Sequence, residues 1–316
     1  MKRRNFLKVA AATAGIPAVG FSAEQGRKWE ITRIPLPGPE CVAIAAEKDA
    51  LWALYSREIF FKTADSEEWQ NYTDYLLGPA WCFCVVPDEE KLPKDRMVYA
   101  GIQSRVVPSP AISWQKTGDR EGVSGGLWMD KLKPSSRLTS LLAMPDENGT
   151  PTLFAADAAQ RNVLRYDADG KFMHRLYADG ELIVPSPYLA MCVGRDGLLR
   201  VVNPGRHRVE AFHVKAAGTP REEPLTWGVS SPGPEGFAGC CNPAWIAVTE
   251  SGNFFTSEKR ILRLKLHDAE GNFIEEVPLP PQQKNVITEG YPVAAEGENL
   301  YVLDTNANVV YRYAKK

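Results

Sequence analysis

The sequence predicts an all-β protein, a six-bladed β-propeller, on three observations. Short apolar strands recur along the chain, and within them apolar and polar residues alternate as in half-buried strands. The recurrence has a period close to that of a four-stranded propeller blade, roughly 40–50 residues. Gly and Pro are frequent, at 25 and 24 residues, and no segment has the periodicity of a long helix. We therefore expect residues 24–316 to form a single propeller domain.

Each blade is expected to contain an apolar strand, a second strand that ends in Asp, Asn or Glu, and a third strand that ends in an aromatic residue. The second strands are Leu153–Asp157, Leu199–Asn203, Phe254–Glu258 and Leu300–Asp304, and they are preceded by two weaker copies, Leu51–Tyr55 and Met97–Gly101, without the polar last residue. The third strands are anchored at Ile59, Val106, Val163, Val209, Ile261 and Val309, at intervals of 47, 57, 46, 52 and 48 residues. The longest interval holds a polar, Gly-rich insertion at residues 117–134, which we interpret as a surface loop.

The two ends of the chain are expected to meet in the last blade. The final copy stops at its third strand, Val309–Tyr313, and leaves no residues for a fourth strand. Trp29–Leu36 has a strand pattern and precedes the first complete copy. We expect it to pair beside Val309–Tyr313 as the outer strand of the sixth blade, because such closure leaves only short, protected edges.

Residues 1–23 are expected to be an export signal. Arg3-Arg4-Asn5-Phe6-Leu7-Lys8 resembles the twin-arginine pattern R-R-x-F-L-K, with Lys2 where the pattern usually has Ser or Thr. The following stretch, Val9–Phe21, is too short and too polar for a stable membrane span. Cleavage after Gly20 or Ala23 would release a periplasmic or secreted protein without a membrane span.

The net charge of the mature chain indicates which classes of partner it can bind. Loss of Lys2, Arg3, Arg4 and Lys8 leaves 33 basic residues against 39 acidic ones, a net charge of −6. A mildly acidic surface without a basic stripe argues against nucleic acid as a partner. We expect a monomer that binds a small molecule or a protein.

Two groups of residues carry a family resemblance. Asn162–Tyr166 and Arg206–Phe212, each behind an Asp or Asn, look like NHL repeats. Gly239-Cys240-Cys241-Asn242-Pro243 and Thr256-Ser257-Glu258-Lys259, with Arg263–Leu266, resemble a group of exported bacterial NHL-type propellers that have G-C-C-N-P and T-S-E-K-G-I motifs. Arg260 stands where that group generally has Gly. The repeat covers nearly the whole mature chain and implies the fold, whereas a fold does not imply a function.

The vicinal cysteines Cys240 and Cys241 mark the candidate site. A buried structural cysteine behaves as a small apolar residue and has no reason to occur in a pair at an Asn-Pro turn. Thiolates, in contrast, are nucleophiles and ligands for soft metals. Cys41 and Cys82 lie near the starts of other inner strands, which converge on the channel. The sequence therefore predicts that Cys41, Cys82, Cys240 and Cys241 together bind a zinc ion, a copper(I) ion or an iron–sulfur cluster.

Two other states of these cysteines stay open at the level of sequence. Cys41 could form a disulfide with Cys82 and Cys240 with Cys241, or all four could be free thiols. Cys84 and Cys192 have apolar neighbours and are expected to pack in the core.

Polar residues near the vicinal pair are candidate ligand contacts. Asn242, Glu258 and Lys259 are expected to bind a ligand at the same end of the ring, although the residues that end second strands also suit turn capping. The four histidines, His174, His207, His213 and His267, are expected at solvated blade edges.

These features predict a binding or redox module at the channel mouth. One alternative is a lactonase-like, metal-dependent hydrolase, for which Glu40 and Asn242 are the obvious members of a metal site. The other alternative is a protein-interaction scaffold without catalysis. The chain has no common hydrolase, Walker or dinucleotide fingerprint.

Overall fold

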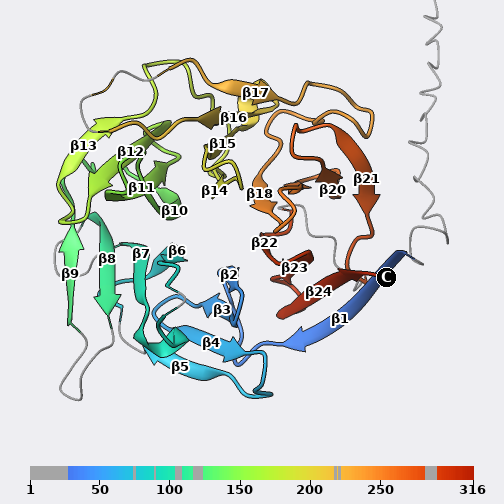
Figure 1. Cartoon of the computed structure of the whole chain (residues 1–316), viewed down its shortest axis with the longest axis horizontal. Helices are drawn as coiled ribbons and strands as arrows, with labels where there is room; N and C mark the ends of the chain where they lie inside the picture. The colour runs from blue at the N-terminus through green and yellow to red at the C-terminus, as the bar shows by residue number, and fades with distance from the viewer. Residues whose placement is uncertain are drawn as a thin grey trace, which may run out of the picture.

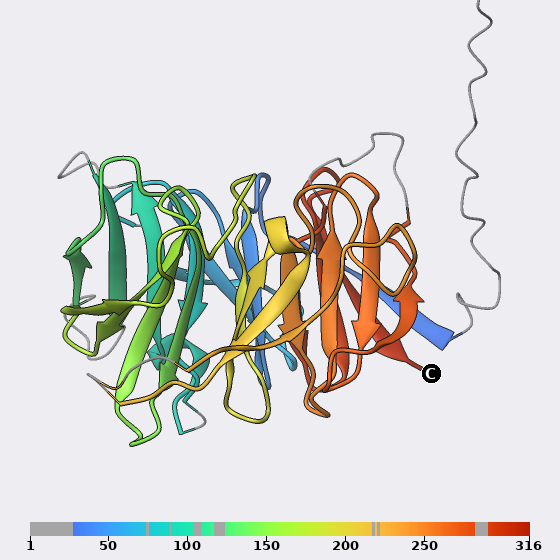
Figure 2. The same cartoon turned by 90° about the horizontal axis from the view of Figure 1, so that it is seen from above.

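The structure is a computed structural model, and it describes residues 28–316 except 74–75, 89, 104–108, 117–123, 217–218, 220–221 and 282–289. The expected export signal, residues 1–23, lies outside the described residues. Six four-stranded antiparallel sheets surround a central axis like the blades of a propeller (Figure 1). Seen from the side, the strands run through the thickness of the resulting disc (Figure 2). The all-β, six-bladed prediction is confirmed.

Each blade takes its strands in chain order from the axis outwards, except the sixth, whose outer strand comes from the N-terminal side. The first three blades are β2 (Ala43–Glu47), β3 (Ala50–Leu54), β4 (Ile59–Thr63) and β5 (Gln70–Thr73); β6 (Ala80–Val85), β7 (Met97–Gln103), β8 (Pro110–Lys116) and β9 (Ser124–Trp128); and β10 (Leu138–Pro145), β11 (Pro151–Asp157), β12 (Asn162–Asp167) and β13 (Phe172–Arg175).

The other three are β14 (Met191–Val193), β15 (Leu199–Asn203), β16 (Arg208–Phe212) and β17 (Leu225–Trp227); β18 (Trp245–Val248), β19 (Phe254–Glu258), β20 (Arg263–His267) and β21 (Phe273–Val277); and β22 (Val293–Glu296), β23 (Asn299–Asp304), β24 (Val309–Lys315) and β1 (Trp29–Pro35). Short 3₁₀ turns occupy Pro93–Asp95 and Pro204–Arg206. Among the described residues no helix is long and apolar enough to cross a membrane.

The ring closes through the pairing of β1 with β24, as the sequence predicts. The two strands are antiparallel, with Trp29 opposite Lys315 and Pro35 opposite Val309. Trp29 is 2% exposed, and its ring lies 6.0 Å from that of Phe255 and 6.4 Å from that of Tyr313. The closing strand is therefore fastened both by backbone hydrogen bonds and by an aromatic anchor.

The apolar core lies between the blades. Separate clusters fill the interfaces of blades 1 and 2, 2 and 3, 5 and 6, and 6 and 1, and one larger cluster spans blades 3, 4 and 5. The inner strand of each blade also contacts those of both neighbours. Every blade is thus held on two sides, which makes the ring one packing unit.

Two strand positions differ from the sequence-based prediction. The third strand of blade 2 begins at Pro110, whereas its expected anchor, Val106, lies outside the described residues. The third strand of blade 5 begins at Arg263, and its expected anchor Ile261 is 50% exposed in the preceding turn. The turn at residues 259–262 is as long as the corresponding turns of blades 1, 3, 4 and 6, but its apolar residue Ile261 lies in the turn, two residues before the strand begins.

The insertion expected as a surface loop at residues 117–134 contains the outer strand of blade 2, β9. Its glycines have a packing role that composition does not show. A Cβ on Gly126 would come within 2.7 Å of Nε1 of Trp114, on the neighbouring strand β8. Gly126 therefore allows a close strand approach within β9, and residues 117–123 of the expected loop lie outside the described residues.

Candidate functional site

The site lies on the face of the ring at which the inner strands begin, here called the entry face. Strand direction alternates within each blade, so the loop before an inner strand and the turn after a second strand share this face. Side chains at the ends of second strands form hydrogen bonds with the loop that precedes the inner strand. Oδ1 of Asp157 accepts the N–H of Arg137 at 2.9 Å, and Oδ1 of Asn203 accepts that of Ile183 at 3.1 Å.

Asn242 shapes the loop that carries the vicinal cysteines. It is buried, and its Nδ2 donates to the carbonyls of Ala238 and Lys259 at 2.7 and 3.2 Å. Its Oδ1 accepts the N–H of Lys259 at 2.9 Å. The loop turns at Gly239, whose φ of 76° favours glycine. Since the whole amide is engaged, Asn242 holds the loop against the turn after β19.

Glu258 is engaged within blade 5. The N–H of Ala238 donates to its Oε2 at 2.9 Å, and its Oε1 lies 2.6 Å from Nζ of Lys265. Both side chains of this ion pair are fully buried. The carboxylate therefore balances the charge of Lys265, a structural role, and does not reach the next residue, Lys259.

The vicinal thiols lie together at the surface of the entry face. Cys240 is exposed and Cys241 is 5% exposed, and their Sγ atoms are 2.9 Å apart. Ser186 and Lys259 lie beside the Cys241 thiol and lower its pKa. Ser186 belongs to the loop that enters blade 4, so the site spans the interface between blades 4 and 5. Nζ of Lys259 donates to Oγ of Ser186 and lies 4.6 Å from the ring centre of Tyr188.

Lys259 is a buried cation without an acidic partner in the described part of the chain. It is 5% exposed, and none of the carboxylates described there forms an ion pair with it. A buried charge is costly unless an opposite charge and hydrogen bonds compensate it. The group placed to compensate Lys259 is the thiol of Cys241 in its ionised form.

The pKa of Cys241 reflects this partner. Burial by itself would raise the pKa of the thiol. Hydrogen bonds from Cys240, Ser186 and Lys259, with the positive charge of Lys259, outweigh burial and lower the pKa below its usual value. Cys241 thus has features of a reactive cysteine: a lowered pKa and an exposed second thiol, Cys240, beside it.

The other predicted ligand cysteines are placed differently. Cys41 packs between blades 6 and 1, where it donates to the carbonyl of Ala43, and Cys82 packs between blades 2 and 3. Burial raises the pKa of each of these two thiols to about 12. The structure thus brings Cys240 and Cys241 together but leaves Cys41 and Cys82 in the core. Within the described residues no three His, Cys, Asp or Glu side chains gather as a metal site.

Cys84 and Cys192 pack in the core, as expected.

One of the four histidines does not lie at a solvated blade edge, where the sequence placed all four. His267 is 1% exposed, with Nε2 3.1 Å from Oγ1 of Thr256 and its ring 4.8 Å from that of Trp227. The expectation of a solvated edge is wrong here, because loop residues and β17 cover this part of blade 5.

Sequence reasoning missed Ser186 and Tyr188. Ser186 stands between Pro185 and Pro187, a rigid segment directly before an inner strand, and this is the signal that could have drawn attention to it. The ring of Tyr188 supports Lys259 on one side and lies 4.9 Å from the ring of Trp245. These aromatic rings fix the ammonium group beside Cys241.

Arg260 stands at the position where the T-S-E-K-G-I motif has Gly, and its backbone conformation is one that favours glycine. Its φ is 66°, a left-handed conformation that glycine adopts without strain. Arg260 therefore occupies a position at which glycine would be unstrained.

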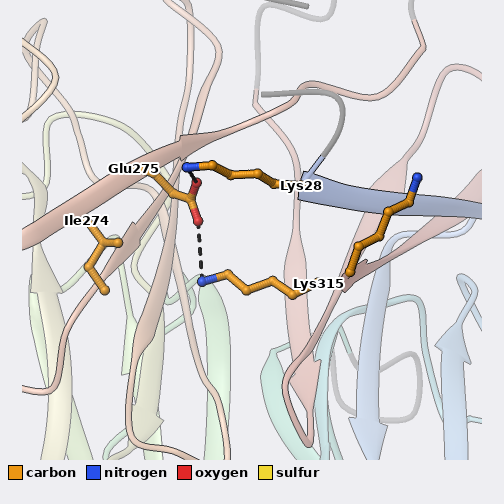
Figure 3. Close-up of a pocket in the computed structure, with 5 residues that line it drawn as sticks. Lys28, Ile274, Glu275 and Lys315 are labelled. Carbon is orange, nitrogen blue, oxygen red and sulfur yellow. Dashed lines mark ion pairs between the residues drawn. The ribbon is translucent and has the colours of Figure 1, made fainter. Parts of the chain in front are cut away.

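A separate pocket lies on the outer rim, where β1, β21 and β24 meet (Figure 3). It has a volume of about 330 Å³ and is lined by Lys28, Ile274, Glu275, Lys315 and Lys316. Nζ of Lys28 lies 3.5 Å from Glu275, and Nζ of Lys315 lies 3.3 Å from it. The ion pairs of this pocket thus link the closing strand β1 and its partner β24 to blade 5. The pocket is separate from the thiol site, which lies in the loop before an inner strand.

No protein-family model and no curated protein sequence matches this chain. Solved structures with a similar fold include virginiamycin B lyase from Staphylococcus aureus, at 10% identity and a TM-score of 0.56 over 91% of this chain and 99% of that one. A gluconolactonase from Xanthomonas campestris has 14% identity and a TM-score of 0.57, over 94% of each chain. The calcium-binding protein regucalcin from Agrobacterium tumefaciens has 14% identity and the same score, over 90% and 93%. At such identities the likeness shows the six-bladed propeller fold alone.

Proposed function

We propose that this protein is an exported thiol redox module, with Cys241 as the attacking thiolate and Cys240 as the resolving thiol. The observation that carries the proposal is the pair of Sγ atoms 2.9 Å apart, with the positive charge of Lys259 lowering the pKa of the more buried thiol. An attacking thiol with a lowered pKa next to an exposed second thiol is the arrangement that disulfide exchange requires.

The reaction uses a disulfide as oxidant. The Cys241 thiolate attacks one sulfur of the disulfide R–S–S–R, forms a mixed disulfide and releases one thiolate, R–S⁻. The Cys240 thiol then loses its proton to the solvent or to that thiolate and attacks the Cys241 sulfur, which releases the second R–S⁻. The protein gains a Cys240–Cys241 disulfide, two electrons pass to the substrate, and the reverse sequence restores the dithiol.

Geometry favours a labile disulfide over a structural one. Adjacent Cα atoms are about 3.8 Å apart across a trans peptide, whereas disulfides usually join Cα atoms about 4.4–6.8 Å apart. A bond between neighbouring residues is therefore strained, and strained disulfides are the readily reduced, catalytic or regulatory ones.

Zinc or an iron–sulfur cluster receives less support. Tetrahedral zinc with Zn–S bonds of about 2.3 Å holds its sulfur ligands about 3.8 Å apart, wider than the 2.9 Å between Cys240 and Cys241. The further sulfur ligands would have to come from Cys41 and Cys82, which are buried in other interfaces. Elemental analysis of anaerobically purified protein tests this alternative, and a stoichiometric thiophilic metal would replace the redox proposal.

The lactonase-like alternative rests on fold likeness. Asn242 is fully engaged in hydrogen bonds to its own blade, and Glu40 lies exposed in the loop before β2. A calcium titration with a lactone hydrolysis assay would detect such an activity. A scaffold without catalysis would show neither this activity nor reversible thiol oxidation.

The redox proposal is tested by the pH dependence of alkylation. We expect iodoacetamide to modify Cys241 of the reduced protein with an apparent pKa below that of a free thiol. Lys259→Met should raise this pKa and slow the reaction at neutral pH, because the thiolate is the nucleophile. The rate should fall about tenfold for each pH unit by which the pKa rises. Modification is followed at each cysteine by fragment-ion mass spectrometry.

Two further variants make the test specific. Lys259→Arg keeps the charge and should retain most of the reactivity, and Lys171→Met, at an exposed lysine of blade 3, should change nothing. Oxidation with a small disulfide should yield a Cys240–Cys241 bond that dithiothreitol removes. An unchanged alkylation profile in Lys259→Met, or no such bond, would refute the proposal.

A further inference from the structure

The charge balance of Lys259 depends on the oxidation state of the vicinal cysteines. In the dithiol form, Cys241 supplies a counter-charge for this buried ammonium group when its thiol ionises, and the lowered pKa of the thiol favours that ionisation. Formation of the Cys240–Cys241 disulfide removes that negative charge, since a disulfide is neutral. The ammonium group stays buried, because Tyr188 and Ser186 hold it in place.

No other group of the described residues takes over as counter-charge. The carboxylate of the preceding residue, Glu258, is already paired with Lys265 at 2.6 Å. The following residue, Arg260, is exposed and adds a second positive charge near the same turn. An uncompensated buried cation is unfavourable, and the protein can relieve it by taking an anion from solution.

We propose that oxidation of Cys240 and Cys241 turns the surroundings of Lys259 into a binding site for a small oxyanion, a carboxylate or a phosphate. The proposal rests on the disulfide chemistry proposed above. The donors are the ammonium group of Lys259 and the hydroxyl of Ser186, whose Oγ is in hydrogen-bond contact with Nζ. Both are hard donors that suit oxygen ligands, and Cys240, at the exposed edge, marks the side from which an anion enters.

Oxidation of the two cysteines and binding of the anion are then coupled, and each favours the other. An anion that binds the disulfide form more tightly than the dithiol form stabilises the disulfide, and oxidation raises anion affinity by the same factor. A tenfold preference for the disulfide form lowers the midpoint potential by about 30 mV at saturating anion, because two electrons are transferred. The anion thus sets the potential at which the module works.

The test is isothermal titration of phosphate and of acetate into the oxidised and the reduced protein. We expect at least one of the two anions to bind the oxidised protein with tenfold or greater preference over the reduced protein. Lys259→Met, oxidised in the same way, should lose this binding. Equal affinity in the two redox states, or binding that survives Lys259→Met, would overturn the proposal.

A variant separates this proposal from the redox function on which it rests. Cys241→Ser removes the thiolate without any oxidation and keeps a side chain of nearly the same size. It should therefore bind the anion as the oxidised protein does. If the wild-type protein forms no vicinal disulfide and Cys241→Ser still binds the anion, the redox function fails and the Lys259 site stands. If Cys241→Ser binds no anion while the disulfide forms normally, the anion site is refuted and the redox function stands.

Discussion

Glu258 and Lys259 are neighbours in the sequence, but their side chains have different partners. Glu258 points into the blade, where its charge is balanced by Lys265, and Lys259 reaches across to the loop of blade 4. The same contrast separates two buried cysteines. The pKa of Cys82 is raised to about 12 by burial, whereas the pKa of Cys241 is lowered by hydrogen-bonding neighbours and a cation despite burial. Partners, and not burial alone, decide reactivity.

His267 predicts a pH dependence of stability. Burial, helped by the charge of Lys265, lowers the pKa of His267 to about 4 in the folded protein, against 6.5 for an unperturbed histidine. The unfolded state therefore binds a proton first as the pH falls. The contribution of His267 to the free energy of unfolding is therefore fully present above pH 6.5. It is lost as the pH falls from 6.5 to 4, by about 3 kcal/mol in total. Urea unfolding at several pH values measures this loss.

The histidine contribution is isolated by comparing variants. His267→Gln should lower stability at neutral pH but flatten its decline between pH 6.5 and 4. His213→Gln changes an exposed histidine and should keep the wild-type slope. A slope that is identical in His267→Gln and the wild type would show that other groups cause the decline.

At the scale of elements, one strand decides whether the sheet edges are exposed. β1 pairs with β24 along its whole length, and Trp29 anchors its start in the cluster between blades 5 and 6. Ion pairs from Lys28 and Lys315 to Glu275 add a fastening on the outer rim (Figure 3). These pairs are partly exposed and contribute little, so the aromatic anchor is expected to dominate.

Trp29→Ala tests the anchor. Removing a buried Trp leaves a cavity and should lower the free energy of unfolding by about 3–5 kcal/mol. Glu30→Ala, at the next and exposed position of the same strand, should change it by no more than about 0.5 kcal/mol. Urea denaturation followed by tryptophan fluorescence and circular dichroism measures both. Equal effects of the two variants would mean that backbone pairing alone closes the ring.

At the scale of the whole molecule, every blade interface shares in the apolar core. Closure joins Trp29 to the last strand, so the ring is complete only when the whole chain has been synthesised. A protein that closes in this way is suited to an export route that carries folded proteins. The twin-arginine signal expected at residues 1–23 stays a prediction.

Export by that route is the prediction at this scale. Replacing Arg3 and Arg4 by Lys should keep the full-length precursor in the cytoplasm, since the signal depends on the arginine pair. Fractionation of bacteria that express the two forms, followed by mass determination, measures both location and cleavage after Gly20 or Ala23. A periplasmic, cleaved product from the double-Lys form would contradict the prediction.

The repeat pattern alone was enough to predict the number of blades and the closing strand. Alternation at period two, and the Asp, Asn or Glu that ends the second strand in blades 3 to 6, are local properties, so Val163, Val209 and Val309 mark third strands correctly. The pattern failed at Ile261, because this apolar residue lies in a turn of ordinary length and nothing local distinguishes it from the first residue of a strand. The Cys240–Cys241 motif likewise identified its loop without knowledge of the fold.

Only the tertiary structure decided which residues share the site. Cys41 and Cys82 begin in similar positions of the repeat, but their side chains face blade interfaces and not the vicinal pair. Ser186 and Lys259 are 73 residues apart, and no local pattern couples them. They meet because blades 4 and 5 pack side by side around the axis. Sequence periodicity determines the strands, whereas the choice of side-chain partners depends on which faces are buried when the ring closes.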